Sequence, residues 1–433
     1  AAGVEEPLLP ARNIDKAPAK ESPYLIPGAV FNVSTSIIGA GIMSIPATFK
    51  VLGVIPAFVM IVLIALVVDI SVEFILRFTY AGDSRTYAAV MRESFGAVGS
   101  VGVQICVMVT NLGCLVMYLI IIGDVLSGKG ADHLGVLQEW FGIQWWNLRA
   151  VALLFIVLFV MLPLLLFRRI ESLWFSSAIS VFLAIVFVVI CSGLAISALL
   201  RNQIKPPRFL PHLENSASFF NLFTAIPVIV TAYTFHFNVH AITVEMGSPS
   251  KMIHATKIAL LLCGAIYFAV GIFGYLLFGD STMDDILVNF DQGTGPSSGV
   301  SALMDDLVRL SYALHLVLVF PLLNFSLRSN IDEFLFPTNA AAVPLASDAR
   351  RFVILTVVLL AVAYGLAIVI PSIWYLFQFM GSTSAVSLSF IFPGALVLRD
   401  IHGISTAKDK AVGAAMVVIA VFTSVTAIST NVY

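Results

Sequence analysis

Long apolar runs separated by short polar segments dominate the chain. A helix needs about 20 residues to cross the hydrocarbon core of a bilayer. Runs near or above this length occupy residues 27–49, 54–78, 99–126, 150–167, 173–200, 219–245, 255–279, 302–325, 352–370, 373–398 and 411–430. The pattern predicts an all-α polytopic membrane protein with eleven transmembrane helices. We expect the polar residues 1–26 to form a disordered cytosolic tail.

Two of these runs are interrupted near their middle. The first contains Gly39-Ala40-Gly41, and each glycine weakens a helix by roughly 1 kcal/mol relative to alanine. The sixth contains His236, Asn238 and His240, which are costly in a membrane unless they face the bundle interior or water. Non-helical backbone in the hydrocarbon region is tolerated only where it is buried in protein or lines a water-filled cavity. The first and sixth helices are therefore predicted to be discontinuous and to form a midplane binding site.

The composition restricts the class of protein. The chain has 433 residues, of which 59% are hydrophobic and 11% charged, whereas a soluble domain has about 25% charged residues. This composition predicts an integral protein of the lipid bilayer. The net charge of −2, without a basic patch, argues against a nucleic-acid partner. The sequence has no nucleophile elbow, metal-ligand cluster or phosphate loop, so we expect no enzyme activity, no cofactor and no metal.

Lysine and arginine predict the orientation, because they accumulate in cytosolic loops. With the N-terminus placed in the cytosol, 16 of the 23 basic residues fall on the cytosolic side and 6 on the other. We therefore expect a cytosolic N-terminus and, after eleven spans, a C-terminus on the far side.

Five stretches resemble the amino acid/auxin permease family. They are FNVSTSIIGAGIMSIPATFKVLG, TAYTFHFNVHAI, GYLLFGD, VRLSYALHLVLVFPLLNFSLR and GSTSAVSLSFIFPGAL. The branch they resemble most is that of the plant vacuolar amino-acid transporters, which are related to the animal system A and N carriers. Phe235 and Ala241 depart from the family, where cysteine and proline are common.

The resemblance implies a LeuT-type fold. Helices 1–5 (residues 27–200) and 6–10 (residues 219–400) would be inverted repeats, and the eleventh helix (411–430) would be peripheral. It also implies a monomer in the vacuolar membrane, with its C-terminus in the lumen, that moves amino acids into the cytosol with protons.

The interrupted helices are predicted to bind both charges of an amino acid. The free amides at a half-helix start stabilise a carboxylate, and Gly39, Ala40, Gly41 and Ile42 are placed to donate. The fold resemblance implies that carbonyls around the two breaks accept from the ammonium group. The predicted contacts are Ser36, Ile37, Tyr233, Thr234, Phe235, His236 and Asn238. Asn111 and Tyr118 share one face of the third helix, where they could contact substrate or bond between helices.

The first and eighth helices carry candidate residues for coupling to protons or to sodium. Sodium-using relatives place the ion between helices 1 and 8, where Thr35 offers a hydroxyl, but Val317 and Val319 occupy positions at which such relatives tend to have threonine. Ser311 and His315 remain on the eighth helix, and a histidine can carry a proton near neutral pH. Protons, carried by His236 or His315, are therefore favoured over sodium. A purely structural role for each histidine stays open.

Two charged residues are candidate gates. Glu245 ends the sixth helix near Lys251 and Lys257, which suggests an inner gate. Arg309 follows Asp305 and Asp306 by one turn, which suggests either an ion pair or a gate at the outer mouth. We thus expect a secondary active amino-acid transporter. The alternatives are a sodium-coupled symporter and an amino-acid sensor with little flux.

Overall fold

The computed structural model describes residues 25–82, 84–129, 133–166, 174–202, 204, 206–213, 216–246, 249–290, 300–336, 345 and 348–432. Within these ranges the chain is almost entirely helical. Ten helical segments are long and apolar enough to cross a membrane, and a bent pair, Ile26–Ile37 with Gly41–Leu52, makes an eleventh. The predicted all-α multi-pass architecture is confirmed, whereas residues 1–24 of the predicted tail lie outside the described ranges.

The first part of the chain forms α1 (Leu25–Ile37), α2 (Gly41–Leu52), α3 (Val54–Ala81), α4 (Tyr87–Ser127), α5 (Val136–Phe141), η1 (Trp145–Asn147), α6 (Arg149–Ile156), η2 (Val157–Met161), α7 (Leu162–Leu166) and α8 (Trp174–Leu200). The second part forms α9 (Ser216–Tyr233), η4 (His236–Asn238), α10 (Val239–Met246), α11 (Pro249–Phe278), η5 (Gly279–Ser281), η6 (Ile286–Phe290), α12 (Val300–Leu335), α13 (Ala349–Val369), α14 (Ile373–Ser382), α15 (Ser384–Val386), η7 (Ser387–Ile391), α16 (Phe392–Arg399) and α17 (Ala407–Val432).

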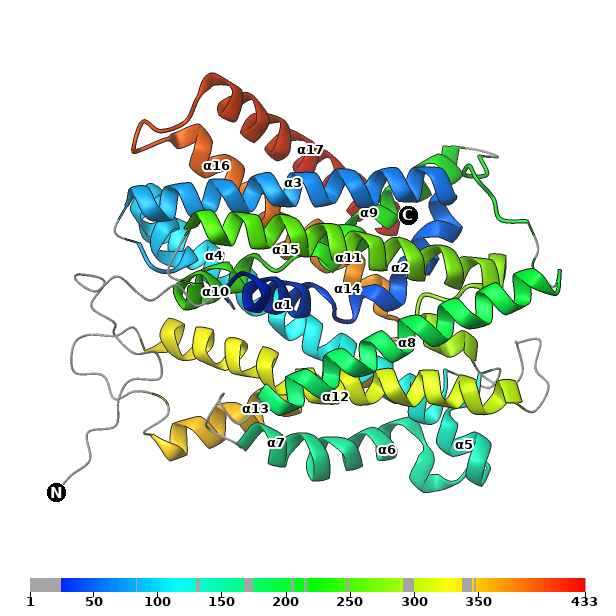
Figure 1. The fold of residues 1–433 in the computed structure, drawn as a ribbon. Helices are drawn as coiled ribbons and strands as arrows, with labels where there is room; N and C mark the ends of the chain where they lie inside the picture. Colours follow the sequence, from blue (N-terminus) through cyan, green and yellow to red (C-terminus); the bar gives the residue numbers. More distant parts are fainter. Residues whose placement is uncertain are drawn as a thin grey trace.

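Most of the long helices run side by side in one bundle (Figure 1). The broken helices lie inside it: α2 packs against α9 and α11, and α9 packs against α14. The span Phe219–Thr243 has 72% of its membrane-crossing stretch buried in protein, against 28% for Ala407–Thr430. The last helix, α17, therefore lies at the edge of the bundle, as the peripheral eleventh helix was expected to do (Figure 1).

The first break separates α1 from α2 by a bend of 62°. The amide of Ile38 still bonds to the carbonyl of Ser34 at 2.8 Å, and helical bonding resumes when Ile42 donates to Gly39 at 3.3 Å. Among the described residues, the amides of Gly39, Ala40 and Gly41 between these two points have no hydrogen-bond acceptor. The low helix propensity of Gly39 and Gly41 favours a break at this point.

The second break separates α9 from α10. Helix α9 ends at Tyr233, a short 3₁₀ turn covers His236–Asn238, and α10 begins at Val239. The prediction that the first and sixth helices are discontinuous is therefore confirmed.

Two other spans contain a π-helical turn just before a proline. Val157–Met161 precedes Pro163, and Ser387–Ile391 precedes Pro393. Proline has no amide hydrogen and crowds the preceding turn, so the helix widens locally instead of keeping its regular bonds.

Candidate functional site

The two breaks touch each other. A Cβ placed on Gly41 would lie 2.7 Å from the Cβ of Ala232 and 2.8 Å from its Cα. On the other side of the break, a Cβ on Gly39 would lie 2.6 Å from the hydroxyl oxygen of Tyr118. A side chain at either position would clash with Ala232 or Tyr118, so the start of α2 lies directly against the end of α9 and the break lies against the Tyr118 hydroxyl.

A single hydroxyl group bridges the ends of the two broken helices. The Tyr267 oxygen on α11 lies 2.8 Å from the carbonyl oxygen of Ile37 and 2.8 Å from that of Ala232. A helix end leaves carbonyls without an intrahelical donor, and Tyr267 supplies one. Because a hydroxyl has one proton, it donates to only one carbonyl at a time. Each of these carbonyls therefore keeps acceptor capacity for a further donor.

Tyr312 bonds to a third carbonyl at the two breaks, that of Gly39. Its hydroxyl, on α12, donates to the carbonyl oxygen of Gly39 at 2.7 Å. The Tyr312 ring packs against Phe187 of α8 with ring centres 5.1 Å apart and against His315 at 4.8 Å. Tyrosine hydroxyls from α11 and α12 thus bond to the carbonyls at the breaks. The sequence did not identify either tyrosine as a site residue.

His236 lies in the second break and is fully buried. Its Nε2 is 2.7 Å from the Ser71 hydroxyl of α3, and its Nδ1 is 3.0 Å from the Ser389 hydroxyl of η7. Ser71 donates its own proton to the carbonyl of Val68 at 2.8 Å, so it accepts from Nε2–H. The neutral ring then takes the proton of Ser389 on Nδ1.

The same arrangement accommodates a protonated ring. Ser389 also lies 3.0 Å from the hydroxyl of Thr234. When Nδ1 carries a proton, Ser389 accepts from it and turns its own proton toward Thr234. Both protonation states of His236 therefore find partners for both ring nitrogens, as a buried polar group requires.

The other predicted contacts at the breaks are polar links between helices or packed aromatic rings. Asn238 donates to the Ser36 hydroxyl of α1 at 3.3 Å. Phe235 is fully buried with its ring centre 5.6 Å from that of His236. Tyr233 packs edge-on against Tyr267 at 5.1 Å. Of the four predicted amides, that of Ile42 already donates within the first turn of α2, which leaves three.

Asn111 does not join this group of contacts. It is buried and donates to the hydroxyl of Ser326 on α12 at 3.1 Å. This is the interhelical hydrogen bond that the sequence left open as an alternative. Tyr118, seven residues later on α4, is the member of the pair that meets the break.

The hydroxyls considered for a cation bond to their own helices. Thr35 donates to the carbonyl of Phe31 at 2.7 Å, and Ser311 donates to that of Val308 at 3.0 Å. Val317 and Val319 are buried in the core, and His315 is buried beside Tyr312. These contacts leave the roles of Thr35, Ser311 and His315 in coupling as predictions.

Arg309 is buried in an ion-pair network. It bonds to the Glu139 carboxylate of α5 at 2.7 Å and to the Leu134 carbonyl at 2.7 Å, while Asp306 is 3.9 Å away. Asp306 accepts instead from the Trp140 indole at 2.9 Å. Arg309 thus ties α12 to α5 mainly through Glu139 rather than through its own helix. Glu245 falls in α10, but its side chain lies outside the described part of the structure.

Comparison with known proteins places the chain in a family. Residues 26–433 match the family model described as "Transmembrane amino acid transporter protein". The chain belongs to this family. The predicted resemblance to the amino acid/auxin permeases is confirmed.

Members of the family from Arabidopsis thaliana are closely similar. Amino acid transporter AVT6C is 61% identical over 409 residues, covering 94% of this chain and 93% of the relative. Amino acid transporter AVT6D is 55% identical over 434 residues, covering 99% and 97%. The similarity therefore extends over nearly the full length of both relatives.

The family fold is also found in solved structures. Two crystal structures of mutant forms of a manganese transporter from Eremococcus coleocola align with TM-scores of 0.57 and 0.56, each covering 94% of this chain and 86% of the other. Sequence identity is 15% and 14%, so the likeness concerns the fold alone. The fold is of the LeuT type. The exact boundaries of the two predicted repeats, 27–200 and 219–400, stay a prediction.

Proposed function

We propose that this protein is a proton-coupled secondary transporter that exports amino acids from the vacuole to the cytosol by alternating access. The observation that carries the proposal is the contact between the two helix breaks. It brings the free amides of Gly39, Ala40 and Gly41 close to the carbonyls of Ile37 and Ala232. A zwitterion has a carboxylate, which can accept from the amides, and an ammonium group, which can donate to the carbonyls.

The amides would bind the α-carboxylate. They stand at the start of α2, where the helix dipole also favours negative charge. Gly39 and Gly41 have no side chain of their own over these amides, and Tyr118 and Ala232 lie where their Cβ atoms would stand. No basic side chain is needed for this, and Arg309 is already paired with Glu139.

The carbonyls would bind the ammonium group. Ile37 and Ala232 share the single proton of Tyr267, so an ammonium group with three donors can bond to the acceptor capacity that remains. Tyr118, which faces Gly39, would add a polar contact at the carboxylate end. The pocket wall made by Phe235 and Tyr233 would then limit the size of the side chain.

His236 is the proposed proton carrier. It joins α3, the second break and η7, and its hydroxyl partners can serve either protonation state. A proton taken up by His236 makes Ser389 donate to Thr234. Thr234 lies two residues after Ala232, whose carbonyl is proposed to bind the ammonium group. In an acidic vacuole, symport with protons would move amino acids toward the cytosol.

Flux measurements in proteoliposomes test this proposal. The purified protein is reconstituted, and uptake of each member of an amino-acid panel is measured with a proton gradient and a sodium gradient imposed separately. We expect acceleration by the proton gradient alone. Acceleration by sodium alone would contradict proton coupling, and binding without any flux would identify a sensor.

A further inference from the structure

Residues 282–290, which follow α11, are packed into the bundle rather than lying over it. Ile286, Leu287, Val288, Asn289 and Phe290 of η6 are all buried. The Asn289 side chain fixes the turn, because its Oδ1 accepts from the Met283 amide at 2.8 Å and its Nδ2 donates to the Ser281 carbonyl at 2.9 Å. We call residues 282–290 the closing segment, and its end of the bundle the outer end, which is predicted to face away from the cytosol.

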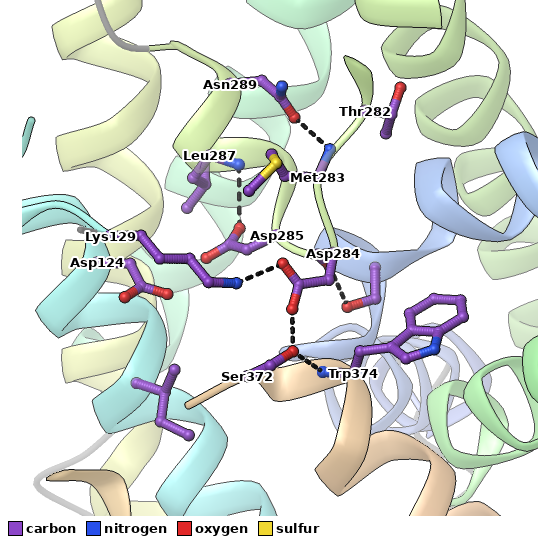
Figure 2. Close-up of polar contacts among 12 residues, drawn as sticks. Asp124, Lys129, Thr282, Met283, Asp284, Asp285, Leu287, Asn289, Ser372 and Trp374 are labelled. Atoms are coloured by element: carbon purple, nitrogen blue, oxygen red, sulfur yellow. Dashed lines mark hydrogen bonds and ion pairs between the residues drawn. The ribbon is translucent and has the colours of Figure 1, made fainter. Parts of the chain in front are cut away.

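The closing segment is fastened to the half-helix that carries the free amides. Ser44 of α2 donates to the Asp284 carbonyl at 2.6 Å, and the Lys50 ammonium donates to the Thr282 carbonyl at 3.0 Å. The Asp284 carboxylate also binds the Lys129 ammonium at 2.6 Å and the Ser372 hydroxyl at the start of α14 (Figure 2). Opening the outer end must release these contacts.

Three carboxylates and two cations lie close together where the closing segment packs against the bundle. Asp284 pairs with Lys129, and Asp124 of α4 pairs with Arg149 of α6. Asp285 is the third carboxylate and is 0% exposed. Figure 2 shows its side chain beside Lys129 and Asp124. Both cations are already matched, so an ionised Asp285 would leave one uncompensated buried negative charge, which is costly.

The contacts of Asp285 give an ionised carboxylate little support. Its Oδ1 accepts from the Leu287 amide at 3.0 Å, and its Oδ2 has no hydrogen-bond partner in the described part of the chain. The groups around it are Asp124 from α4, Asp284 and Lys129, and the Tyr312 hydroxyl from α12, while Ser372 is the polar contribution of α14. Lys50 of α2 is engaged with Thr282.

We infer that Asp285 is a proton-binding residue of the outer end, which takes up a proton as the closing segment packs onto α2 and releases it as the segment opens. The inference rests on the proposed function only for its link to transport. The proton is the ligand, and it comes from the compartment that the outer end faces.

The direction of the effect follows from burial. Burial raises the pKa of Asp285 well above its ordinary value of 3.8, and the Asp124 carboxylate raises it further. When the segment opens, water returns and the pKa falls back. Acid on the outer side therefore favours the closed conformation, and the advantage is lost as the pH rises through the raised pKa. A single linked proton changes the ratio of closed to open protein by up to about tenfold per pH unit.

Asp284 does not produce this response. Lys129 lowers its pKa below 3.8 against the opposing effect of burial, so it stays ionised in both conformations above that pH. Its role in this inference is to occupy Lys129. If Asp284 is neutralised, Lys129 becomes available to Asp285, and the pH response moves to lower pH.

The test uses the full chain in proteoliposomes, with Asp285→Asn, Asp284→Asn and a matched control, Asp280→Asn, which removes an exposed carboxylate that pairs with Arg208 nearby. Amino-acid exchange is measured with the same pH on both sides, so that no proton gradient drives it through His236, while that pH is varied. We expect the wild type and Asp280→Asn to respond equally to acid, Asp285→Asn to lose the response, and Asp284→Asn to show it at lower pH. An unchanged response in Asp285→Asn overturns the inference.

A second measurement does not depend on transport. Infrared spectra of the purified wild type and variants at neutral pH, subtracted from one another, report the carbonyl stretch of protonated carboxyl groups. We expect the wild type to have a band of this kind that is missing from Asp285→Asn and from Asp285→Ser, which keeps an acceptor for the Leu287 amide. A wild type without flux in any gradient would refute the proposed function alone. Absence of the band would refute the inference about Asp285 even if flux is normal.

Discussion

Gly41 and Ala232 are in direct backbone contact across the two broken helices. A Cβ on Gly41 would lie 2.7 Å from that of Ala232, which is closer than side-chain carbons approach each other. This contact holds the end of α9 against the start of α2. It explains why a glycine is needed at position 41 for packing.

Gly41→Ala should therefore separate α2 from α9 and displace the free amides from the carbonyls of Ile37 and Ala232. Overpacking of this kind costs about 1–3 kcal/mol. We expect transport to fall by about tenfold or more while the protein still inserts, measured as initial uptake per mole of folded protein. Gly365→Ala on α13 is the matched control, because a Cβ there meets nothing within 4 Å. Equal uptake by both variants would contradict the contact.

Tyr267→Phe should weaken substrate binding. The variant keeps the ring that packs against Tyr233 but removes the proton shared by Ile37 and Ala232. The two carbonyls, each left without this donor at a cost of about 1–3 kcal/mol, are then no longer held beside each other, so we expect the site to lose its geometry and KM to rise by about tenfold. Tyr364→Phe removes a comparable bond, 2.9 Å to the Ala150 carbonyl, at the edge of the bundle and should leave KM unchanged. An unaltered KM in Tyr267→Phe would rule out the bridge.

His236→Gln should separate transport from its proton dependence. Glutamine can bond to Ser71 and Ser389 but cannot carry the proton. We expect exchange of amino acid at equal pH to survive, while acceleration by a proton gradient is lost. His402→Gln removes a histidine that lies 3.2 Å from Glu93, far from the breaks in sequence, and should keep the acceleration. Acceleration that persists in His236→Gln would remove this histidine from coupling.

Arg309 and Glu139 should behave as a buried pair. Removing one partner leaves a buried charge and costs about 3–5 kcal/mol, whereas an apolar replacement of both is far less harmful. We expect Arg309→Met to lower the unfolding temperature in detergent more than Arg309→Met combined with Glu139→Leu. A double variant less stable than the single one would show that the pair is not what holds α12 to α5.

Sequence predicted the parts of this structure that depend on local chemistry. Gly39 and Gly41 weaken a helix wherever they occur, and His236 in an apolar run requires an interior position, so both breaks could be placed from residues alone. Chain length and hydropathy likewise placed the membrane spans. Two spans differ clearly. Helix α4 begins at Tyr87 rather than near residue 99, because a kink at Gly96, with φ 68°, joins a less apolar helix to it. Helix α12 continues to Leu335 rather than ending near residue 325.

The partners of the site residues could not be predicted in this way. Tyr267 and Tyr312 lie in apolar runs, where a tyrosine is most simply a packed ring, and Ser71 and Ser389 are 165 and 153 residues from His236. Arg309 was assigned to the nearby Asp305 and Asp306, yet Glu139, 170 residues away, is its main partner. Such pairs depend on which helices are neighbours, and hydropathy does not carry that information.

The central claim is that bared peptide groups at the two breaks bind both charges of an amino acid. Counterflow of a labelled neutral amino acid in proteoliposomes, with competitors that lack either the carboxylate or the ammonium group, tests it most directly. We predict that the intact zwitterion competes and that neither analogue does at the same concentration. Equal competition by the amine without a carboxylate would contradict the claim.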